Sequence, residues 1–280
     1  MSRLVPGVAT SIAPGVRRLL APNPGRMTGP GTNTYLLGDA QVAVLDPGPA
    51  IDAHIAAIAE AAPDRIEWIV VTHTHPDHSP AARSLAEITG ASLLGQRAPD
   101  GPSQDQTFQP DRVLEDGDLL ETPEFTLRAI HTPGHASNHV CYRHERLDWL
   151  FTGDHIMGGS TVVINPPDGN MGDYLASLSR LKLLQLKALA PGHGEIIDSP
   201  NELVDWLIDH RLGREARVVS TMEKNADLSL PDLTPLVYDD VDASLHALAE
   251  RSLLAHLIKL EEERRAVCEN ELWRLVSSDL

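Results

Sequence analysis

The stretch THTHPDH, residues 72–78, is the part of the sequence from which fold and function are best inferred. It follows the apolar run IEWIVV, which predicts a buried β-strand. Residues two apart on an extended segment point the same way, so His73 and His75 can reach one metal ion. Asp77 and His78 stand where the chain turns toward a helix, and they can face a second ion. Imidazole and carboxylate ligands suit zinc, with iron or manganese as alternatives.

Three further ligand candidates stand at predicted strand ends or tight turns. They are His135 in HTPGHASNH, Asp154 in FTGDH and His193 in APGHG. Neighbouring glycine or proline lets the backbone turn sharply and direct a side chain into a cleft. Unrelated surface histidines are the alternative interpretation.

The seven candidates suffice for two metal ions. The expected assignment is His73, His75 and His135 on the first ion, Asp77, His78 and His193 on the second, and Asp154 bridging. Three histidines on one ion leave a coordination position for water, as in catalytic zinc sites.

The order HxHxDH, then H, D and H, resembles the metallo-β-lactamase superfamily of dinuclear hydrolases over most of residues 1–198. The resemblance implies an α+β fold, the αβ/βα sandwich, with the metals at one edge of two packed sheets. It also implies that Asp46 of LDPG supports the metal site from behind. Asp77 is then both a ligand and the catalytic residue that orients the nucleophile or handles its proton.

Other stretches resemble a narrower group, the β-lactamase-like protein 2 proteins, which carry a C-terminal winged-helix-like domain. The stretches are GPGTNTYLLG, HTPGHASNH, INPPDGNMGDYLASL and HRLGRE. From residue 199 on, the residue pattern alone fits either a winged-helix-like domain or a plain helical cap. The resemblance favours the winged-helix-like domain, so we expect domains over residues 1–198 and 199–280.

Hydrophobic periodicity predicts the elements of both domains. In the first we expect a hairpin over 35–46, strands over 66–72, 125–130, 140–142 and 149–151, and helices over 51–62, 80–89 and 174–186. In the second we expect helices over 201–223 and 241–265, a proline-containing connector (LSLPDLTPLVY) between them, and a hairpin in AVCENELWRLV.

Four other residues have a functional and a structural interpretation. His139 either hydrogen-bonds a ligand or is an ordinary core histidine. His210 and Arg214 share a helix face at i, i+4 spacing and either receive a substrate phosphate or carboxylate or form ion pairs. Tyr174 either lines the mouth of the cleft or contacts a helix end. The remaining histidines are expected to be structural or exposed: His54, His131, His144, His155, His246 and His256.

The composition limits the partners and the location. The chain has 280 residues and a net charge of −17, which disfavours non-specific binding of nucleic acid or anionic membranes. No run approaches the ~18 apolar residues of a membrane span. The N-terminus lacks the apolar core of a signal peptide, and Cys141 and Cys268 fit two reduced thiols. We therefore expect a cytoplasmic protein that does not bind membranes.

These observations favour a zinc-dependent hydrolase that uses a metal-bridging hydroxide on a small-molecule ester, thioester or lactone. The first alternative is a single-strand endoribonuclease, which the narrower resemblance suggests and for which single-stranded RNA is the partner. The second is a non-catalytic, metal-stabilised binding module, which the complete ligand set disfavours. A β-lactamase role is the weakest enzymatic interpretation because no export signal is seen. The C-terminal domain can bind nucleic acid, cover the site or mediate a homodimer.

Overall fold

The computed structural model describes residues 5–225 and 227–276, and the chain folds into two compact units. Unit 1 runs to Thr132 and includes Asn138–Val162 and Gln185–Pro200. Unit 2 comprises Pro133–Ser137, Val163–Leu184 and the chain from Asn201 on. The boundary expected at residue 198 lies close to Pro200. The grouping of residues 163–184 with unit 2 was not expected from the sequence.

The first sheet of unit 1 has seven strands in sequence order, antiparallel from β1 to β4 and parallel from β4 to β7. Its strands are β1 (Thr10–Ala13), β2 (Val16–Leu20), β3 (Asn33–Leu37), β4 (Val42–Leu45), β5 (Ile66–Val70), β6 (Ser92–Gly95) and β7 (Arg112–Val113). The hairpin predicted over residues 35–46 is confirmed as β3 and β4.

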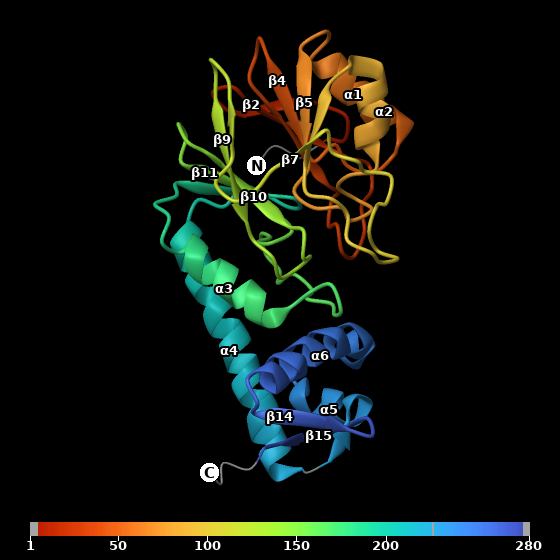
Figure 1. Ribbon diagram of the computed structural model, residues 1–280, viewed down its shortest axis with the longest axis vertical. Coiled ribbons are helices and arrows are strands. Elements are labelled where there is room, and N and C mark those ends of the chain that lie inside the picture. Colours follow the sequence, from red (N-terminus) through yellow and green to blue (C-terminus); the bar gives the residue numbers. More distant parts are fainter. Residues whose placement is uncertain (1–4, 226, 277–280) are drawn as a thin grey trace. The chain divides into compact units, whose positions relative to one another are not determined.

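Two helices connect parallel strands of this sheet, α1 (Asp52–Ala61) and α2 (Ala81–Thr89). Their apolar residues pack on the sheet in a core that includes Leu36, Ile58 and Leu85. Figure 1 shows both helices on the face of the sheet that is turned away from β9, β10 and β11. The α2 helix ends at Gly90, whose φ of 75° is a left-handed conformation that glycine adopts without a Cβ clash. Both helices were predicted, with ends within one residue.

The second sheet of unit 1 has the order β12-β11-β10-β9-β8. Its strands are β8 (Leu119–Glu121), β9 (Thr126–His131), β10 (Val140–His144), β11 (Trp149–Gly153) and β12 (Ala188–Pro191). Only β11 and β12 run parallel to each other.

The two sheets enclose the main core of unit 1, which includes Leu45, Val70, Phe125 and Phe151. Two buried tyrosines join the sheets. The Tyr35 hydroxyl of β3 donates to the Pro191 carbonyl of β12 at 2.8 Å, and the Tyr142 hydroxyl of β10 donates to the Val71 carbonyl at 2.9 Å. These bonds pair polar groups that would otherwise be buried without a partner. They also fix how the two sheets meet at the edge where β5 and β12 end and β3 and β10 begin.

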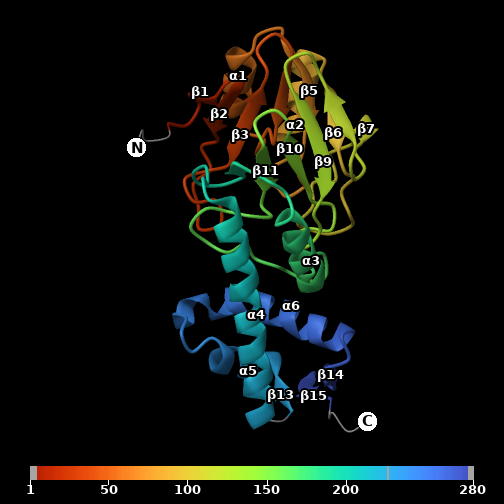
Figure 2. The same ribbon diagram turned by 90° about the vertical axis from the view of Figure 1, so that its left-hand side faces the viewer.

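Unit 2 contains the long helix α4 (Pro200–Lys224) and the helices and small sheet that follow it in the chain. Its other elements are α3 (Met171–Leu181), β13 (Leu228–Ser229), α5 (Leu230–Val237), the 3-10 helix η1 (Ala243–Leu245), α6 (His246–Glu262), β14 (Ala266–Glu269) and β15 (Leu272–Leu275). The hairpin predicted in the tail is confirmed as β14 and β15, and β13 pairs with β15. Figure 2 shows α6 crossing α4, with α5 and the small sheet near the end of α4.

The prediction of a connector between the two long helices is wrong, because this stretch forms the helix α5. Ser229 caps this helix by accepting a hydrogen bond from the amide of Asp232. Proline in the first turn costs little because the amide there has no intrahelical acceptor. Leu233 and Val237 are fully buried in the core of unit 2, so packing outweighs the proline at position 235.

The segment 163–184 groups with unit 2 because α3 packs against α6. The Asn170 side chain caps α3 and also donates to the Glu262 carboxylate at 3.2 Å. Among the helices of the described residues, none has a stretch both long and apolar enough to span a bilayer.

Candidate metal centre

The ligand candidates of unit 1 follow strands that end at one edge of the two sheets. Asp46 comes directly after β4, and His73 comes three residues after β5. Asp154 follows β11, and His193 lies two residues past β12. The amide of Asn33 donates to the Gly192 carbonyl at 2.7 Å, which ties the start of β3 to the end of β12 at this edge.

The structure gathers all seven predicted ligands into two groups. In each group one nitrogen or carboxylate oxygen per residue lies within 4.8 Å of the others: His73, His75 and His135 in the first group, and Asp77, His78, Asp154 and His193 in the second. This grouping matches the two ions expected from the sequence, while the role of each residue as a ligand stays a prediction.

The second group has the dimensions of a coordination sphere. Oδ1 of Asp154 lies 3.3 Å from Nε2 of His78 and 3.3 Å from Nε2 of His193. Oδ2 of Asp77 lies 3.1 Å from Nε2 of His193. Two atoms that each lie about 2.05 Å from a tetrahedral ion are about 3.3 Å apart, so these separations fit zinc. The same nitrogen and oxygen donors also suit iron or manganese.

The first group presents nitrogens in the same way. Nε2 of His73 lies 3.0 Å from Nδ1 of His75. Nδ1 of His135 lies 2.8 Å from the Val163 carbonyl, so this nitrogen donates and Nε2 keeps its lone pair. Neutral imidazole with one nitrogen bonded to an acceptor is the usual form of a histidine ligand.

Asp46 fixes the orientation of His78. Its carboxylate accepts hydrogen bonds from the amide and the hydroxyl of Thr72, at 2.7 and 2.8 Å, and from Nδ1 of His78 at 2.9 Å. Nε2 of His78 therefore faces the group. Asp46 itself has a φ of 50°, a left-handed conformation that is uncommon for a residue with a side chain. This geometry is what the resemblance implied for Asp46.

The His193 ring is held in a similar way by the backbone. Its Nδ1 lies 3.1 Å from the Gly31 carbonyl, so Nδ1 donates and Nε2 faces Asp77 and Asp154. Among the described residues, the buried Nε2 atoms of His78 and His193 make no hydrogen bond of normal geometry. Buried polar atoms normally have a partner, so two converging lone pairs indicate a place for a cation.

The electrostatics of the second group point the same way. Burial alone lowers the pKa of the His78 and His193 rings, but the nearby carboxylates raise it by more. Asp77, Asp154 and Asp46 hold the pKa of His78 well above its usual value, and Asp154 and Asp77 raise the pKa of His193 to about 10. The cluster therefore stabilises positive charge, and a metal ion has to compete with protons for these nitrogens.

His139 supports the centre without joining either group. It is fully buried, and its Nε2 accepts a hydrogen bond from the amide of Asp154 at 3.2 Å. Its Nδ1 lies 3.0 Å from the Thr132 hydroxyl. Of its two interpretations from the sequence, the contact with a ligand candidate matches this geometry, through the backbone of Asp154 rather than its side chain.

The other substrate candidates lie in unit 2 and make structural contacts there. Tyr174 is fully buried, with the Arg211 guanidinium 5.4 Å from its ring centre, so it does not line an open cleft. Arg214 pairs with Asp240 at 2.9 Å, and His210 stacks on the Trp206 ring. The ion pair of Arg214 matches its structural interpretation, whereas the stacked ring of His210 and the arginine contact of Tyr174 are neither the expected ion pair nor the expected contact with a helix end.

Sequence reasoning missed the part played by two glycines. A Cβ on Gly192 would lie 2.7 Å from Cε1 of His78 and 2.8 Å from Oδ1 of Asp154. A Cβ on Gly153 would lie 2.5 Å from the Thr72 hydroxyl and 2.7 Å from Nε2 of His139. The signal was present in the letters APGHG and FTGDH, where these glycines suggested only a sharp turn.

Comparison with known proteins agrees with this geometry. The family model of the metallo-beta-lactamase superfamily matches residues 27–193, and that of the beta-lactamase associated winged helix domain matches residues 229–273.

The chain is 32% identical over 238 residues to a beta-lactamase-like protein 2 homolog of Caenorhabditis elegans, covering 82% of this chain and 78% of the relative. It is 31% identical over 201 residues to an atrochrysone carboxyl ACP thioesterase of Aspergillus fumigatus, covering 69% and 60%. A beta-lactamase domain protein from Burkholderia ambifaria has the same fold, with a TM-score of 0.81, 22% identity and coverage of 98% and 96%. The chain therefore belongs to the metallo-beta-lactamase superfamily and carries a beta-lactamase associated winged helix domain.

Proposed function

We propose that the chain is a dinuclear, zinc-dependent hydrolase of small-molecule acyl compounds, with a thioester as the first substrate to test and an ester or lactone next. The superfamily of hydrolases and the His and Asp groups support metal-dependent hydrolysis. Two divalent ions held there would lower the pKa of a coordinated water and polarise the carbonyl of the acyl group. The relative that is named an ACP thioesterase supports the choice of thioester.

Asp77 is the member of the second group that is best placed to act on a substrate. Its side chain is 25% exposed, against 11% for Asp154 and 0% for His78. Burial raises the pKa of Asp77, but the His78 and His193 rings outweigh it and hold the pKa below its usual value. The carboxylate is therefore ionised at neutral pH, where it can orient the attacking water and accept its proton.

The pairing of the arginines on α4 favours a small substrate over RNA, and it is the observation that carries the choice. An endoribonuclease needs positive charge on a surface that holds the RNA backbone, and the arginines of this helix are candidates for it. Arg214 is 2.9 Å from Asp240, and Arg217 pairs with Asp239 and Asp240. Arginines whose charge is neutralised by aspartates of the same unit add little to a surface that binds the phosphates of RNA.

The experiment is a hydrolysis panel with the purified, zinc-loaded protein. The substrates are an acyl thioester, an aryl ester, a lactone and a labelled single-stranded RNA, each tested with the parent and with Asp77→Ala. We expect thioester cleavage by the parent and its loss in the variant. Cleavage of RNA alone would replace this proposal with the nuclease. Absence of all cleavage in a protein that holds its metal would favour the binding module.

The metal, the location and the partners belong to the same proposal. Elemental analysis of protein purified without added metal tests zinc against iron and manganese, and cell fractionation tests the cytoplasmic location. Flotation with anionic vesicles should show no membrane binding. Sedimentation tests whether the chain is a homodimer.

A further inference from the structure

Four of the seven ligand candidates stand in one short segment, residues 73–78, which we call the ligand segment. It lies between β5, which ends at Val70, and α2, which begins at Ala81, so the hydrogen bonds of a strand or helix do not fix its course. Two of its candidates belong to the first group and two to the second. The separation of the two groups therefore depends on what holds this segment in place.

Thr74 is a buried anchor near the start of the ligand segment. Its side chain is fully buried, and its hydroxyl donates to Oε1 of Gln104, a residue that is 7% exposed. Its carbonyl accepts the amide of Asp105 at 2.7 Å. The Asn138 side chain donates to the same hydroxyl at 2.7 Å and to the carbonyl of Arg97 at 3.2 Å. Both polar groups of Thr74 are thus bonded to residues 104 and 105.

Ser79 is a second buried anchor, directly after the end of the ligand segment. It is 1% exposed, and its hydroxyl donates to Oδ2 of Asp105 at 2.8 Å. Gln104 and Asp105 are neighbours in the chain, so their Cα atoms are only about 3.8 Å apart. Two adjacent residues therefore bond both anchors, Thr74 and Ser79, and we call this arrangement the 104–105 clamp.

The clamp encloses ligand candidates of both groups. Between the two anchors lie His75 of the first group and Asp77 and His78 of the second. Because both anchors are bonded to the same two residues, the clamp limits how far the segment can lengthen or shift. It therefore constrains the positions of these three side chains relative to one another.

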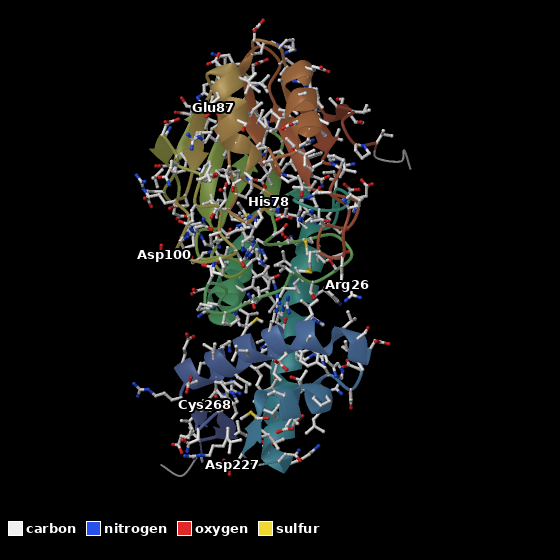
Figure 3. The ribbon with its side chains drawn as sticks, turned by 90° about the vertical axis from the view of Figure 1, so that its right-hand side faces the viewer. Arg26, His78, Glu87, Asp100, Asp227 and Cys268 are labelled. Carbon is white, nitrogen blue, oxygen red and sulfur yellow. The ribbon has the colours of Figure 1, made fainter. Side chains whose placement is uncertain are left out.

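The loop that carries the clamp, residues 96–111, is anchored independently of the ligand segment. Phe108 is 1% exposed and packs in the core beneath α1 and α2. Figure 3 shows Asp100, which stands on this loop, toward the same end of unit 1 as His78, with Glu87 of α2 toward the opposite end. The clamp thus connects the ligand segment to the packed core of the unit.

We propose that Gln104 and Asp105 are positioning residues of the metal centre, which hold the two ligand groups at the separation that two ions need to act on one substrate. This inference deepens the proposed function and rests on its dinuclear centre. The clamp bonds the backbone and hydroxyls of the ligand segment, so it sets where the ligands lie. By contrast, Asp46 and the carbonyls of Val163 and Gly31 set how individual rings are turned.

The test removes the clamp from the side of the ligand segment, so that the loop itself is unchanged. Thr74→Val and Ser79→Ala each remove one hydroxyl of the clamp. Thr74→Ser is the conservative variant, because it keeps the hydroxyl. Thr107→Val is the matched control, because it removes a hydroxyl that bonds the same Asp105 carboxylate from within the loop.

The first readout is the affinity of the full chain for zinc, measured by competition with a chelator. We expect Thr74→Val and Ser79→Ala each to weaken binding of the more weakly held ion by about 10-fold, the low end for loss of the groups that support metal ligands. Thr74→Ser and Thr107→Val should stay within about twofold of the parent.

The double variant of Thr74→Val and Ser79→Ala tests whether the two anchors act as one unit. We expect it to weaken zinc binding by clearly less than the product of the two single effects, because freeing one anchor already removes the fixed span. Effects that multiply would show two independent contacts and would overturn the clamp.

The second readout is electron paramagnetic resonance of the cobalt(II)-loaded proteins, which reports whether two ions lie close enough for their spins to couple. A contact that only stabilises the fold would not change this coupling. At saturating cobalt, the parent and Thr107→Val should show coupled ions, and Thr74→Val a larger fraction of uncoupled cobalt. Thermal unfolding checks that each variant is folded at the temperature of loading.

The outcomes separate this proposal from the proposed function. Parent-like affinity and coupling in both Thr74→Val and Ser79→Ala would overturn the clamp and leave the dinuclear hydrolase standing. Fewer than two ions in the zinc-loaded parent would overturn both proposals.

Discussion

Each unit of the molecule holds a cluster of charged side chains that is shielded from water, and the two clusters differ in how charge is balanced. In unit 2, Glu215 is 6% exposed and pairs with Lys259 at 2.8 Å and Arg265 at 2.9 Å. In unit 1, the group around His78 brings together two carboxylates and two imidazoles.

The difference shows in the titration of the two clusters. In unit 2, burial raises the pKa of Glu215, but the side chains of His256, Lys259 and Arg265 outweigh it and hold the pKa at about 2. That cluster is complete without any further ion. In unit 1, burial raises the pKa values of Asp77 and Asp154, but the His78 and His193 rings outweigh it and hold both pKa values below their usual value. A buried cluster whose charges are neutralised by its own side chains is structural. A cluster whose imidazole nitrogens and carboxylate oxygens converge on one point is a binding site for a cation.

Removing Asp154 should have the largest effect on function. Asp154→Ala takes away the proposed bridge between the two ions, and we expect kcat/KM for the best substrate to fall by about 1,000-fold, as for loss of a group that stabilises developing charge. The metal-free variant should melt at a lower temperature than the metal-free parent, because His78 and His193 lose a carboxylate that stabilises their protonated rings, and circular dichroism checks that the variant is folded at the assay temperature. Near-parent activity of this variant would remove the distinction between the two clusters.

Removing Glu215 should instead act on stability alone. Glu215→Ala leaves Lys259 and Arg265 without their shared carboxylate, and we expect the free energy of unfolding of unit 2 to fall by about 3 kcal/mol, the low end for a broken buried pair. Metal content should stay at the parent level. Denaturant unfolding, followed by tryptophan fluorescence, measures the first quantity, and loss of metal in this variant would contradict the account.

Two glycine substitutions, each of which adds a single methyl group, sharpen the comparison between the two units. The Cβ of Gly192→Ala would meet His78 and Asp154, and we expect metal affinity to fall by about 10–100-fold, as for disturbed support of a ligand. Gly213→Ala on α4 meets nothing within 4 Å and should stabilise its helix by about 0.4–1 kcal/mol. Competition with a chelator and thermal unfolding give the two values. Equal metal affinity in both variants would show that His78 and Asp154 lie farther from Gly192 than in the structure.

Acid should act on His54 of unit 1 and Glu215 of unit 2 in different pH windows, which is the smallest expected effect. Burial lowers the pKa of His54 in unit 1 to about 4, so the unfolded chain takes up a proton that the folded unit refuses. Unit 1 therefore loses stability as pH falls from 6.5 toward 4. Glu215 has a depressed pKa of about 2, so its contribution to unit 2 is lost only as pH falls from 4.5 toward 2. The pH dependence of the free energy of unfolding should lose part of its slope between pH 6.5 and 4 in His54→Gln and between pH 4.5 and 2 in Glu215→Gln, and an unchanged slope would argue against that assignment.

Much of the fold and of the metal centre was predictable because both rest on local patterns. The spacing of THTHPDH, together with single histidines and an aspartate beside glycine or proline, identified the seven residues that the structure gathers into two groups. The seven residues could be predicted because they stand near strand ends that meet at one edge of the sheets. The place of a strand end in the sequence therefore indicates its place in the fold.

The features that the sequence did not reveal depend on contacts between distant segments. Packing of Leu233 and Val237 turns a proline-containing connector into α5. The partner of Arg214 is Asp240, 26 residues away, and no local pattern reveals this pair. The burial of Tyr174 likewise follows from the tertiary packing of unit 2.

The most direct test of the central claim is the metal content of the purified chain and of His193→Ala, measured by mass spectrometry of the elements after dialysis. The account predicts about two equivalents of a divalent transition metal in the parent and about one in the variant, because only the second group loses a ligand. Two equivalents in both proteins, or none in the parent after loading with zinc, would contradict the assignment of these residues to a dinuclear centre.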